Sequence, residues 1–238
     1  MIVVKTLENI ELKLLIDFNK LMYYKRINVE ENIKHKMDNP FAKNPFDEII
    51  IAKDHEDIVG QIGMMPSKFL YNNNEYNAFW GIDYIVKKEY RGTATGIILV
   101  KKALKKEYHF GMGLSDSSFK IVTILGEKTI GYLTKYLKIV SFFDVFSNLF
   151  YTKKLKKDFI FPEQIKLENS NFVKLNYANQ IKTNGYWNTN TLEFIRDEKF
   201  IEWRFFYQQD KYYIYKHYSN KKTDSNAYFV IRPIVWKN

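Results

Sequence analysis

A turn of small residues, Arg91 to Gly96, is the stretch of this sequence best suited to chemistry. It lies between an aromatic-rich apolar run, Ala78 to Val86, and an amphipathic run, Ile97 to Lys106. A strand, a small-residue turn and a helix start form a site for a phosphorylated ligand, because free N–H groups and the positive dipole of the helix N-terminus attract anions. The alternative is an ordinary strand-to-helix loop with a solvated arginine.

The hydrophobic pattern around this turn supports the phosphate-loop interpretation. Alternation in the apolar run predicts a strand with Phe79, Gly81, Asp83 and Ile85 on one face and Trp80, Ile82, Tyr84 and Val86 on the other. Downstream, Ile97, Val100 and Leu104 recur at helical spacing. The period changes from two to about 3.6 at the turn, which is where a phosphate loop must lie.

The turn resembles the signature of the GNAT acyltransferases, which is Arg or Gln, two residues, Gly, one residue, then Gly or Ala. Arg91, Ala94 and Gly96 occupy the signature positions. The resemblance implies that the backbone amides of Arg91, Gly92, Thr93, Ala94, Thr95 and Gly96 hold the pyrophosphate of acetyl-CoA or another acyl-CoA. It also implies that main-chain groups of Ile85, Val86 and Lys87 meet the pantetheine arm. Ala94 departs from the usual Gly and adds a methyl group where the pyrophosphate comes close.

A second resemblance to the same family lies downstream. Phe110 to Ser115 is expected to form a short buried strand, Ser117 to Leu125 a capped helix, and Lys128 to Leu137 another strand. This order is similar to the fifth strand, fourth helix and sixth strand of the GNAT fold. Many members carry a Tyr that protonates the departing thiolate, and Val122 stands at that position here.

The resemblance implies an acyl-CoA-dependent N-acetyltransferase that acts on an amine of a small molecule or an amino sugar. Asp83 is the candidate base, because apolar neighbours on the strand are expected to raise its pKa; a structural, hydrogen-bonding role is the alternative. Ser115 could bind the thiol or the acceptor, or cap the next helix. Tyr132 and Tyr84 are candidate substitutes for the missing acid.

A second hypothesis is a catalytically degenerate GNAT-fold module that binds a partner or nucleic acid. Ala94 and Val122 favour it, whereas Arg91, Gly96 and the strand-turn-helix setting favour the enzyme. Titration with acetyl-CoA is the observation that separates the two.

Composition limits the remaining classes. The chain has 238 residues, of which 46% are hydrophobic, which is enough for one large domain or for one domain and part of a second. It has no Cys, which excludes disulfides and fits a reducing cytoplasm. No apolar run approaches the about 18 residues that span a bilayer. We therefore expect a soluble, cytoplasmic protein.

The net charge of +10 raises the question of nucleic acid. However, the 37 basic residues are 32 Lys and only 5 Arg, spread through the chain, whereas nucleic-acid recognition favours the planar Arg fork. We expect a generally basic surface that also attracts the phosphates of CoA. The four histidines, His35, His55, His109 and His217, lack metal-ligand spacing, so no metal is expected.

The expected fold class is α/β (α+β), with a mixed central sheet flanked by helices. Strands are expected at Ile2 to Leu7, Glu48 to Lys53 and Asp57 to Leu70, and helices at Ile10 to Met22 and Val29 to Met37. The loop from Asn39 to Asp47 is either a substrate lid or, as we favour, a packed connection. Residues 1–138 form the expected acyl-CoA-binding domain.

Residues 139–238 form the expected C-terminal extension. Its first part, Val140 to Tyr151 followed by a lysine-rich run, favours a packed helix over a membrane-surface helix. Arg196 to Phe205 and the following Tyr212 to Tyr215 are similar to the start of the second domain in two-domain bacterial GNAT-like proteins. Trp203 and Arg204 are expected to anchor this element, Trp203 by burial and Arg204 by a carboxylate pair. The sequence leaves the oligomeric state open.

Overall fold

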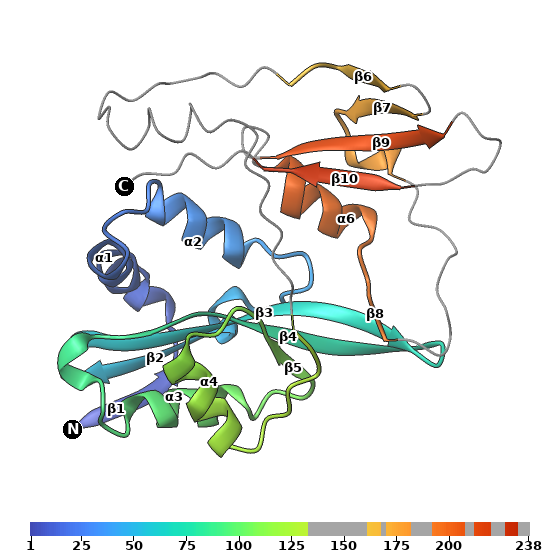
Figure 1. Cartoon of the computed structure of the whole chain (residues 1–238). Helices are drawn as coiled ribbons and strands as arrows, with labels where there is room; N and C mark the ends of the chain where they lie inside the picture. Colours follow the sequence, from blue (N-terminus) through green and yellow to red (C-terminus); the bar gives the residue numbers. More distant parts are fainter. Residues whose placement is uncertain (133–160, 168–169, 182–191, 208–211, 220–226, 233–238) are drawn as a thin grey trace, which may run out of the picture.

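The molecule is described here from a computed structural model, which covers residues 1–132, 161–167, 170–181, 192–207, 212–219 and 227–232. A mixed sheet occupies the N-terminal part, and a smaller antiparallel sheet lies in the C-terminal part (Figure 1). The fold class is therefore the mixed α/β class that the sequence predicted. Among these residues, no helix is long and apolar enough to cross a membrane.

The first sheet has the strand order β1-β2-β3-β4-β5, and a short sixth strand, β8, pairs with β3. Neighbouring strands are antiparallel except for β4 and β5, which run parallel. The strands are β1 (Ile2–Thr6), β2 (Ile49–Asp54), β3 (Asp57–Tyr71), β4 (Asn74–Val86), β5 (His109–Gly111) and β8 (Glu193–Phe194). The short 3-10 turns η1 (Asn9–Glu11), η2 (Pro45–Glu48) and η3 (Lys88–Tyr90) connect these elements.

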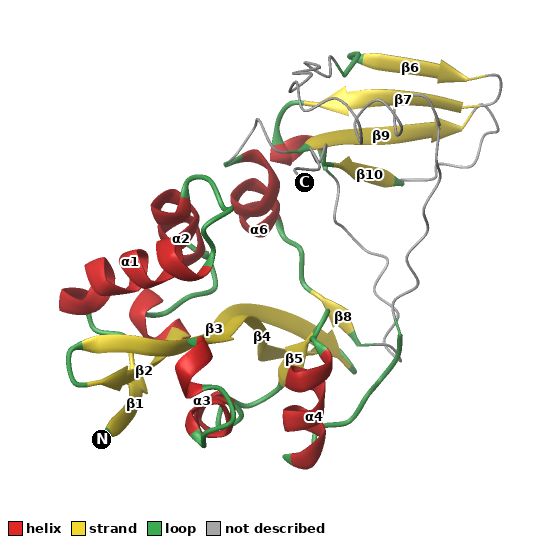
Figure 2. Ribbon diagram, turned by 60° about the vertical axis from the view of Figure 1, so that its left-hand side comes forward, coloured by secondary structure: helices red, strands yellow, loops and turns green. Residues whose placement is uncertain are grey.

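Helices cover both faces of this sheet (Figure 2). On one face, α1 (Leu12–Met22) and α2 (Val29–Met37) pack through Leu15, Phe18 and Ile33. On the other, α3 (Thr95–Ala103) packs through Leu99, Val100 and Ala103, with α4 (Asp116–Ile124) beside it. Ile51 faces the first helix pair and Ile50 the second, and both are almost fully buried. Successive side chains of β2 point to opposite faces of the sheet, so this strand contributes residues to both hydrophobic cores.

A β-bulge interrupts β4 near its end. Gln61 of β3 lies opposite Ile85 and Gly63 lies opposite Ile82, so one residue of β3 faces two residues of β4. Asp83 is one of these two, and its φ is 49°, in the left-handed region. The bulge overturns the predicted alternation, because Phe79, Tyr84 and Val86 all pack against the same core cluster.

The second sheet has the order β10-β9-β7-β6, and all its neighbours are antiparallel. Its strands are β6 (Gln164–Leu167), β7 (Ser170–Leu175), β9 (Tyr213–Ser219) and β10 (Tyr228–Ile231). Below it lie the 3-10 turn η4 (Ala178–Gln180), the short helix α6 (Glu198–Ile201) and its π-helical continuation η5 (Glu202–Phe206). Leu175, Ile201, Phe206 and Ile214 form the core between them.

Aromatic side chains join the C-terminal part to the first sheet and to α2. Trp203 is buried, and its Nε1 donates to the carbonyl of His35 on α2 at 2.7 Å. The rings of Trp203 and Tyr207 each lie 5.0 Å from the His35 ring. The predicted anchoring by Trp203 is therefore confirmed.

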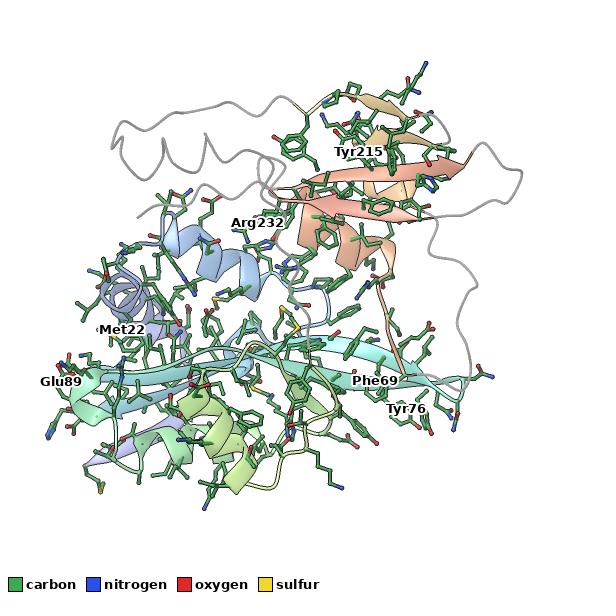
Figure 3. All side chains as sticks on the ribbon, viewed as in Figure 1. Met22, Phe69, Tyr76, Glu89, Tyr215 and Arg232 are labelled. Atoms are coloured by element: carbon green, nitrogen blue, oxygen red, sulfur yellow. The ribbon has the colours of Figure 1, made fainter. Side chains whose placement is uncertain are left out.

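Further aromatic contacts gather at the far end of the β3–β4 hairpin. There Phe69 and Tyr76, both labelled in Figure 3, stack with their ring centres 5.1 Å apart, and the centre of the Phe194 ring lies 6.3 Å from that of Phe69. The loop from Asn39 to Asp47 was expected to be a packed connection. Asn39 is buried, and the Phe41 ring stacks on the Phe200 ring with 5.8 Å between the ring centres. The packed connection is confirmed.

Two predicted strands after α3 differ from the structure. The strand expected at Phe110 to Ser115 is the shorter β5, and it is only partly buried. The strand expected at Lys128 to Leu137 is absent from its described part, residues 128–132; the rest lies outside the described residues, as does the segment from Val140 to Tyr151. The division of the chain at residue 138 stays a prediction, and β8 shows that a later segment contributes to the first sheet.

Candidate functional site

The predicted phosphate loop lies at the N-terminus of α3, as expected. The amide of Arg91 bonds to the carbonyl of Lys88, and the amide of Thr95 bonds to Thr93 Oγ1. The amides of Gly92, Thr93, Ala94 and Gly96 have no hydrogen-bond partner among the described residues. Ala94 is the N-cap of α3 and its side chain cannot cap the helix. The free donors and the helix dipole therefore remain available to an anion.

Tyr84 explains the glycine at the end of this loop. A Cβ on Gly96 would lie 2.4 Å from the Tyr84 hydroxyl oxygen, which is closer than two such atoms can approach. Burial raises the pKa of Tyr84, so its hydroxyl keeps its proton at neutral pH. The hydroxyl thus lies directly beneath the loop, as a neutral hydrogen-bonding group.

Strands β4 and β5 pair over only three residues of each strand. They pair only at Phe79–Gly81 and His109–Gly111, while β4 continues to Val86. From Ile82 to Val86, β4 therefore has an edge without a neighbouring strand among the described residues. An unpaired edge offers main-chain groups to an extended ligand. This edge leads from the Asp83 bulge to the phosphate loop.

Some of the main-chain groups predicted for the pantetheine arm already have partners in the chain. The carbonyl of Val86 accepts a hydrogen bond from Arg91 Nε at 3.0 Å. The amide of Lys87 donates to the carbonyl of Val59 at 2.8 Å. Arg91, although exposed, thus ties the loop to the end of β4.

Asp83 lies in the bulge with two cations. Its Oδ1 pairs with Arg26 Nη1 at 3.0 Å, and its Oδ2 pairs with Lys36 Nζ. Burial alone would raise the pKa of Asp83, but the charges and hydrogen bonds of Lys36 and Arg26 outweigh it and hold the pKa below its usual value. The predicted raised pKa is therefore wrong, because the sequence did not reveal the two cations.

Two buried side-chain amides hold the bulge through hydrogen bonds. The side chains of Asn19 on α1 and Gln61 on β3 form a reciprocal pair, with Asn19 Nδ2 donating to Gln61 Oε1 at 2.6 Å. Gln61 Nε2 also donates to the main-chain carbonyl of Asp83 at 3.2 Å. Both amides are almost fully buried, so removing one would leave the other without a partner and lower the free energy of unfolding. It couples α1 to the position of Asp83.

A small pocket opens beside Asp83 between the α1–α2 face and the sheet. Its free space is about 40 Å³, measured for the centre of a water-sized sphere. Polar groups come from Lys36, Asp83, Glu48, Asn19 and Gln61, and most of the remaining wall is apolar: Leu15, Ile33, Met37, Pro45, Ile49, Met64, Met65, Pro66 and Ile82. A pocket with few, converging polar groups is typical of a small-molecule site.

Ser115 and Tyr132 are placed apart from this pocket. Ser115 caps α4, its Oγ accepting from the amide of Ser118 at 3.3 Å. Tyr132 is 91% exposed. Neither residue lines the pocket, and their predicted catalytic roles stay untested.

The sequence analysis did not identify Arg26 or Lys36. Arg26 precedes α2 and Lys36 lies within it, and each is more than forty residues away from Asp83 in the sequence. Arg26 is one of only five arginines, which was a weak signal, whereas Lys36 is one of 32 lysines. No group of three or more His, Cys, Asp or Glu side chains that could hold a metal occurs in the part of the chain that the structure describes.

Among known proteins, similar ones were found by structure and not by sequence. No protein-family model matches the chain, and no curated protein matches its sequence. A predicted acetyltransferase from Clostridium acetobutylicum, solved with acetyl-CoA, is 16% identical, with a TM-score of 0.44 over 57% of this chain and 96% of that one. Glucosamine-6-phosphate N-acetyltransferase from Arabidopsis thaliana is 15% identical, with a TM-score of 0.41 over 58% and 99%.

A transcriptional regulator from Bacillus halodurans is 14% identical, with a TM-score of 0.44 over 58% of this chain and 100% of that one. All three likenesses are distant, with TM-scores below 0.5. The likeness concerns the fold, and the chemistry of this chain has to be inferred from its own residues.

Proposed function

We propose that this chain is an acyl-CoA-dependent N-acyltransferase, which transfers an acetyl or other acyl group to an amine of a small molecule. One observation carries the proposal: the unpaired edge of β4, from Ile82 to Val86, connects the Asp83 pocket with the free amides at the start of α3. A ligand that spans both must be long, with an anionic group at one end and a reactive group at the other. Acyl-CoA has this form.

The chain's own groups suit each part of this ligand. The amides of Gly92, Thr93, Ala94 and Gly96 suit the pyrophosphate. The main-chain edge of β4 suits the amides of the pantetheine arm. The acyl thioester then lies near the bulge, where Asp83 and the small pocket meet the edge.

The transfer needs a deprotonated amine next to the thioester. The amine nitrogen attacks the thioester carbon, a C–N bond forms and the C–S bond breaks, releasing the CoA thiolate. The nitrogen loses two protons, counted from the ammonium form: one leaves to water and one ends on the thiol sulfur. Asp83 stays ionised because its pKa is lowered, so it orients the amine and the water that takes the proton.

Titration with acetyl-CoA tests the proposal most directly. A ligand present at about 100 times its dissociation constant adds about 2.7 kcal/mol to the free energy of unfolding, which raises the melting temperature. We expect such a rise with acetyl-CoA and none with acetate. No rise with acetyl-CoA or with longer acyl-CoAs, in a folded sample, would sink the proposal.

The variant Asp83→Asn separates binding from chemistry. We expect it to reduce turnover at least about tenfold while acetyl-CoA still raises the melting temperature, since the phosphate loop is untouched. Lys34→Gln, on the same helix as Lys36 but paired with Glu30, is the control and should turn over normally. Unchanged turnover in Asp83→Asn would remove Asp83 from the reaction.

A binding module without catalysis is the second candidate function. The hydrogen bond from Arg91 Nε to the Val86 carbonyl favours it, because it occupies part of the edge that a pantetheine arm would use. Val122, at the position of the family's thiolate acid, has no proton to give. A folded protein that acetyl-CoA does not stabilise is the result expected of this candidate.

A further inference from the structure

The two cations beside Asp83 outnumber the carboxylate that they share. Arg26 and Lys36 together carry two positive charges and Asp83 one negative charge, so this triad of residues has a net charge of +1. The side chains of Arg26 and Lys36 are 43% and 32% exposed, whereas that of Asp83 is 16% exposed. The two cations are therefore more accessible to a ligand from solvent than the carboxylate is, and Lys36 also lines the pocket.

Both cations keep donors for a further anion. The Arg26 guanidinium has five N–H donors, and its bond to Asp83 uses one. The guanidinium carbon lies 3.5 Å from the centre of the Tyr23 ring, a cation–π contact that favours this position of the side chain. The Lys36 ammonium has three donors and also lines the pocket. The pair is thus held in place before any ligand arrives.

The pocket below the cations suits a small apolar group. Its wall includes Leu15, Ile33, Met37, Met64 and Ile82, and the space open to the centre of a water-sized sphere is about 40 Å³. A short hydrocarbon side chain suits the apolar part of this wall, beside the polar groups of Asn19, Glu48 and Gln61.

We propose that the acceptor is an amino acid with a short apolar side chain, or an acid of the same form with its amine beside a carboxylate. This inference rests on the proposed acyl transfer. The acceptor carboxylate binds Arg26 and Lys36, the amine lies against Asp83, and the side chain enters the apolar pocket. A polycationic acceptor is disfavoured by the +1 triad and by the net charge of +10 of the whole chain.

Matched acceptors test this inference with the full chain and acetyl-CoA. L-valine, L-leucine and L-methionine are each compared with the amine that remains when the carboxylate is replaced by hydrogen, and spermidine serves as the polycation. We expect kcat/KM to be at least about tenfold higher for each amino acid than for its amine, because a charge-assisted hydrogen bond is lost with the carboxylate. Spermidine is expected to be the poorest acceptor.

Single variants connect this preference to the two cations. Arg26→Gln and Lys36→Gln should each lower the ratio between amino acid and amine, mainly by raising KM for the amino acid. Lys34→Gln removes an equal charge from the exposed side of α2 and should leave the ratio unchanged. Melting temperatures of all three variants show whether the fold is retained. A ratio that falls equally in Lys34→Gln points to the general surface charge and contradicts the assignment.

Failure of this inference can be told apart from failure of the proposed function. If acetyl-CoA stabilises the chain but the amines react as well as the amino acids, the acceptor assignment is overturned and acyl transfer stands. If acetyl-CoA has no effect, acyl transfer fails. Calorimetric titration with L-valine and with its amine, without CoA, then decides the anion site: binding of L-valine alone supports it, and equal or absent binding overturns it.

Discussion

Glu48 is a carboxylate in an unusual setting. It ends η2, it is half-buried, and its Oε2 has no hydrogen-bond partner among the described residues. Burial raises the pKa of Glu48 to about 7, with the charge of Lys106 opposing and that of Asp47 adding to the shift. Nothing in the sequence distinguishes Glu48 from its neighbours, because the shift arises from packing between distant segments.

The raised pKa of Glu48 makes the stability of the fold depend on pH. Below the unfolded pKa of 4.5 the carboxyl group is protonated in both the folded and the unfolded state, so its ionisation does not change the free energy of unfolding. As pH rises from 4.5 to about 7, only the unfolded state loses the proton, so the free energy of unfolding falls. We expect Glu48→Gln to be about 2 kcal/mol more stable than the parent at pH 8, a value reduced for partial solvent contact, and similar at pH 4.

Urea unfolding at the two pH values measures this difference. Glu56→Gln is the control, because the Glu56 side chain is 95% exposed and its loss should change stability equally at both pH values. A Glu48→Gln variant that is less stable than the parent at pH 8 would show that the carboxylate has a compensating partner.

The turn from β4 into α3 depends on one close contact. Gly96 leaves room for the Tyr84 hydroxyl, and Tyr84 is turned toward α3 by the bulge at Asp83. We expect Gly96→Ala to lose about 1–3 kcal/mol of stability, since overpacking moves the loop, and to bind acetyl-CoA more weakly. Removing the hydroxyl in the double variant Gly96→Ala/Tyr84→Phe should restore much of both.

A double-mutant cycle, read by urea unfolding and by acetyl-CoA titration, measures this coupling. Tyr84→Phe alone should stay close to the parent in stability. If the two substitutions act additively, Gly96 is required by the backbone and not by Tyr84.

At the scale of elements, the sequence predicted much of the fold and less of the site. Hydrophobic patterns placed β1, α1, α2, β2, β3 and α3 within a few residues, because the helices carry an apolar stripe and β2 and β3 are apolar runs bounded by turn residues. The position of the turn between β4 and α3 was predicted for the same reason, whereas its role in phosphate binding stays a prediction. The bulge was not predicted, since no residue type at Asp83 marks it, and the Arg26–Asp83–Lys36 triad follows from the bulge. Local patterns cannot reveal pairings between residues far apart in the chain.

For the whole molecule, the contact between Trp203 and His35 joins the C-terminal part to a wall of the pocket. The Trp203 indole donates to the His35 carbonyl at 2.7 Å, and α2 carries both His35 and Lys36. We expect Trp203→Phe to keep an aromatic ring against His35 but lower the free energy of unfolding by about 1–3 kcal/mol, because the buried hydrogen bond from the indole is lost.

Tyr207→Phe is the matched control for Trp203→Phe. Its ring also stacks on His35, but Tyr207 is 59% exposed, so loss of its hydroxyl should change stability by less than about 0.5 kcal/mol. Chemical denaturation of both variants, with a fluorescence and a circular-dichroism readout, checks this. Equal effects of the two substitutions would contradict the hydrogen-bond explanation.

The pairing of β8 with β3 has a consequence for how the molecule is made. Phe194 lies opposite Phe69, so the sixth strand of the first sheet comes from a segment synthesised long after the other five. Pairings between such distant segments form slowly, because a long loop must close first. During translation, the edge of β3 near Phe69 therefore stays open until residue 194 leaves the ribosome, and a nascent chain stopped before that point would expose an aromatic strand edge that favours aggregation.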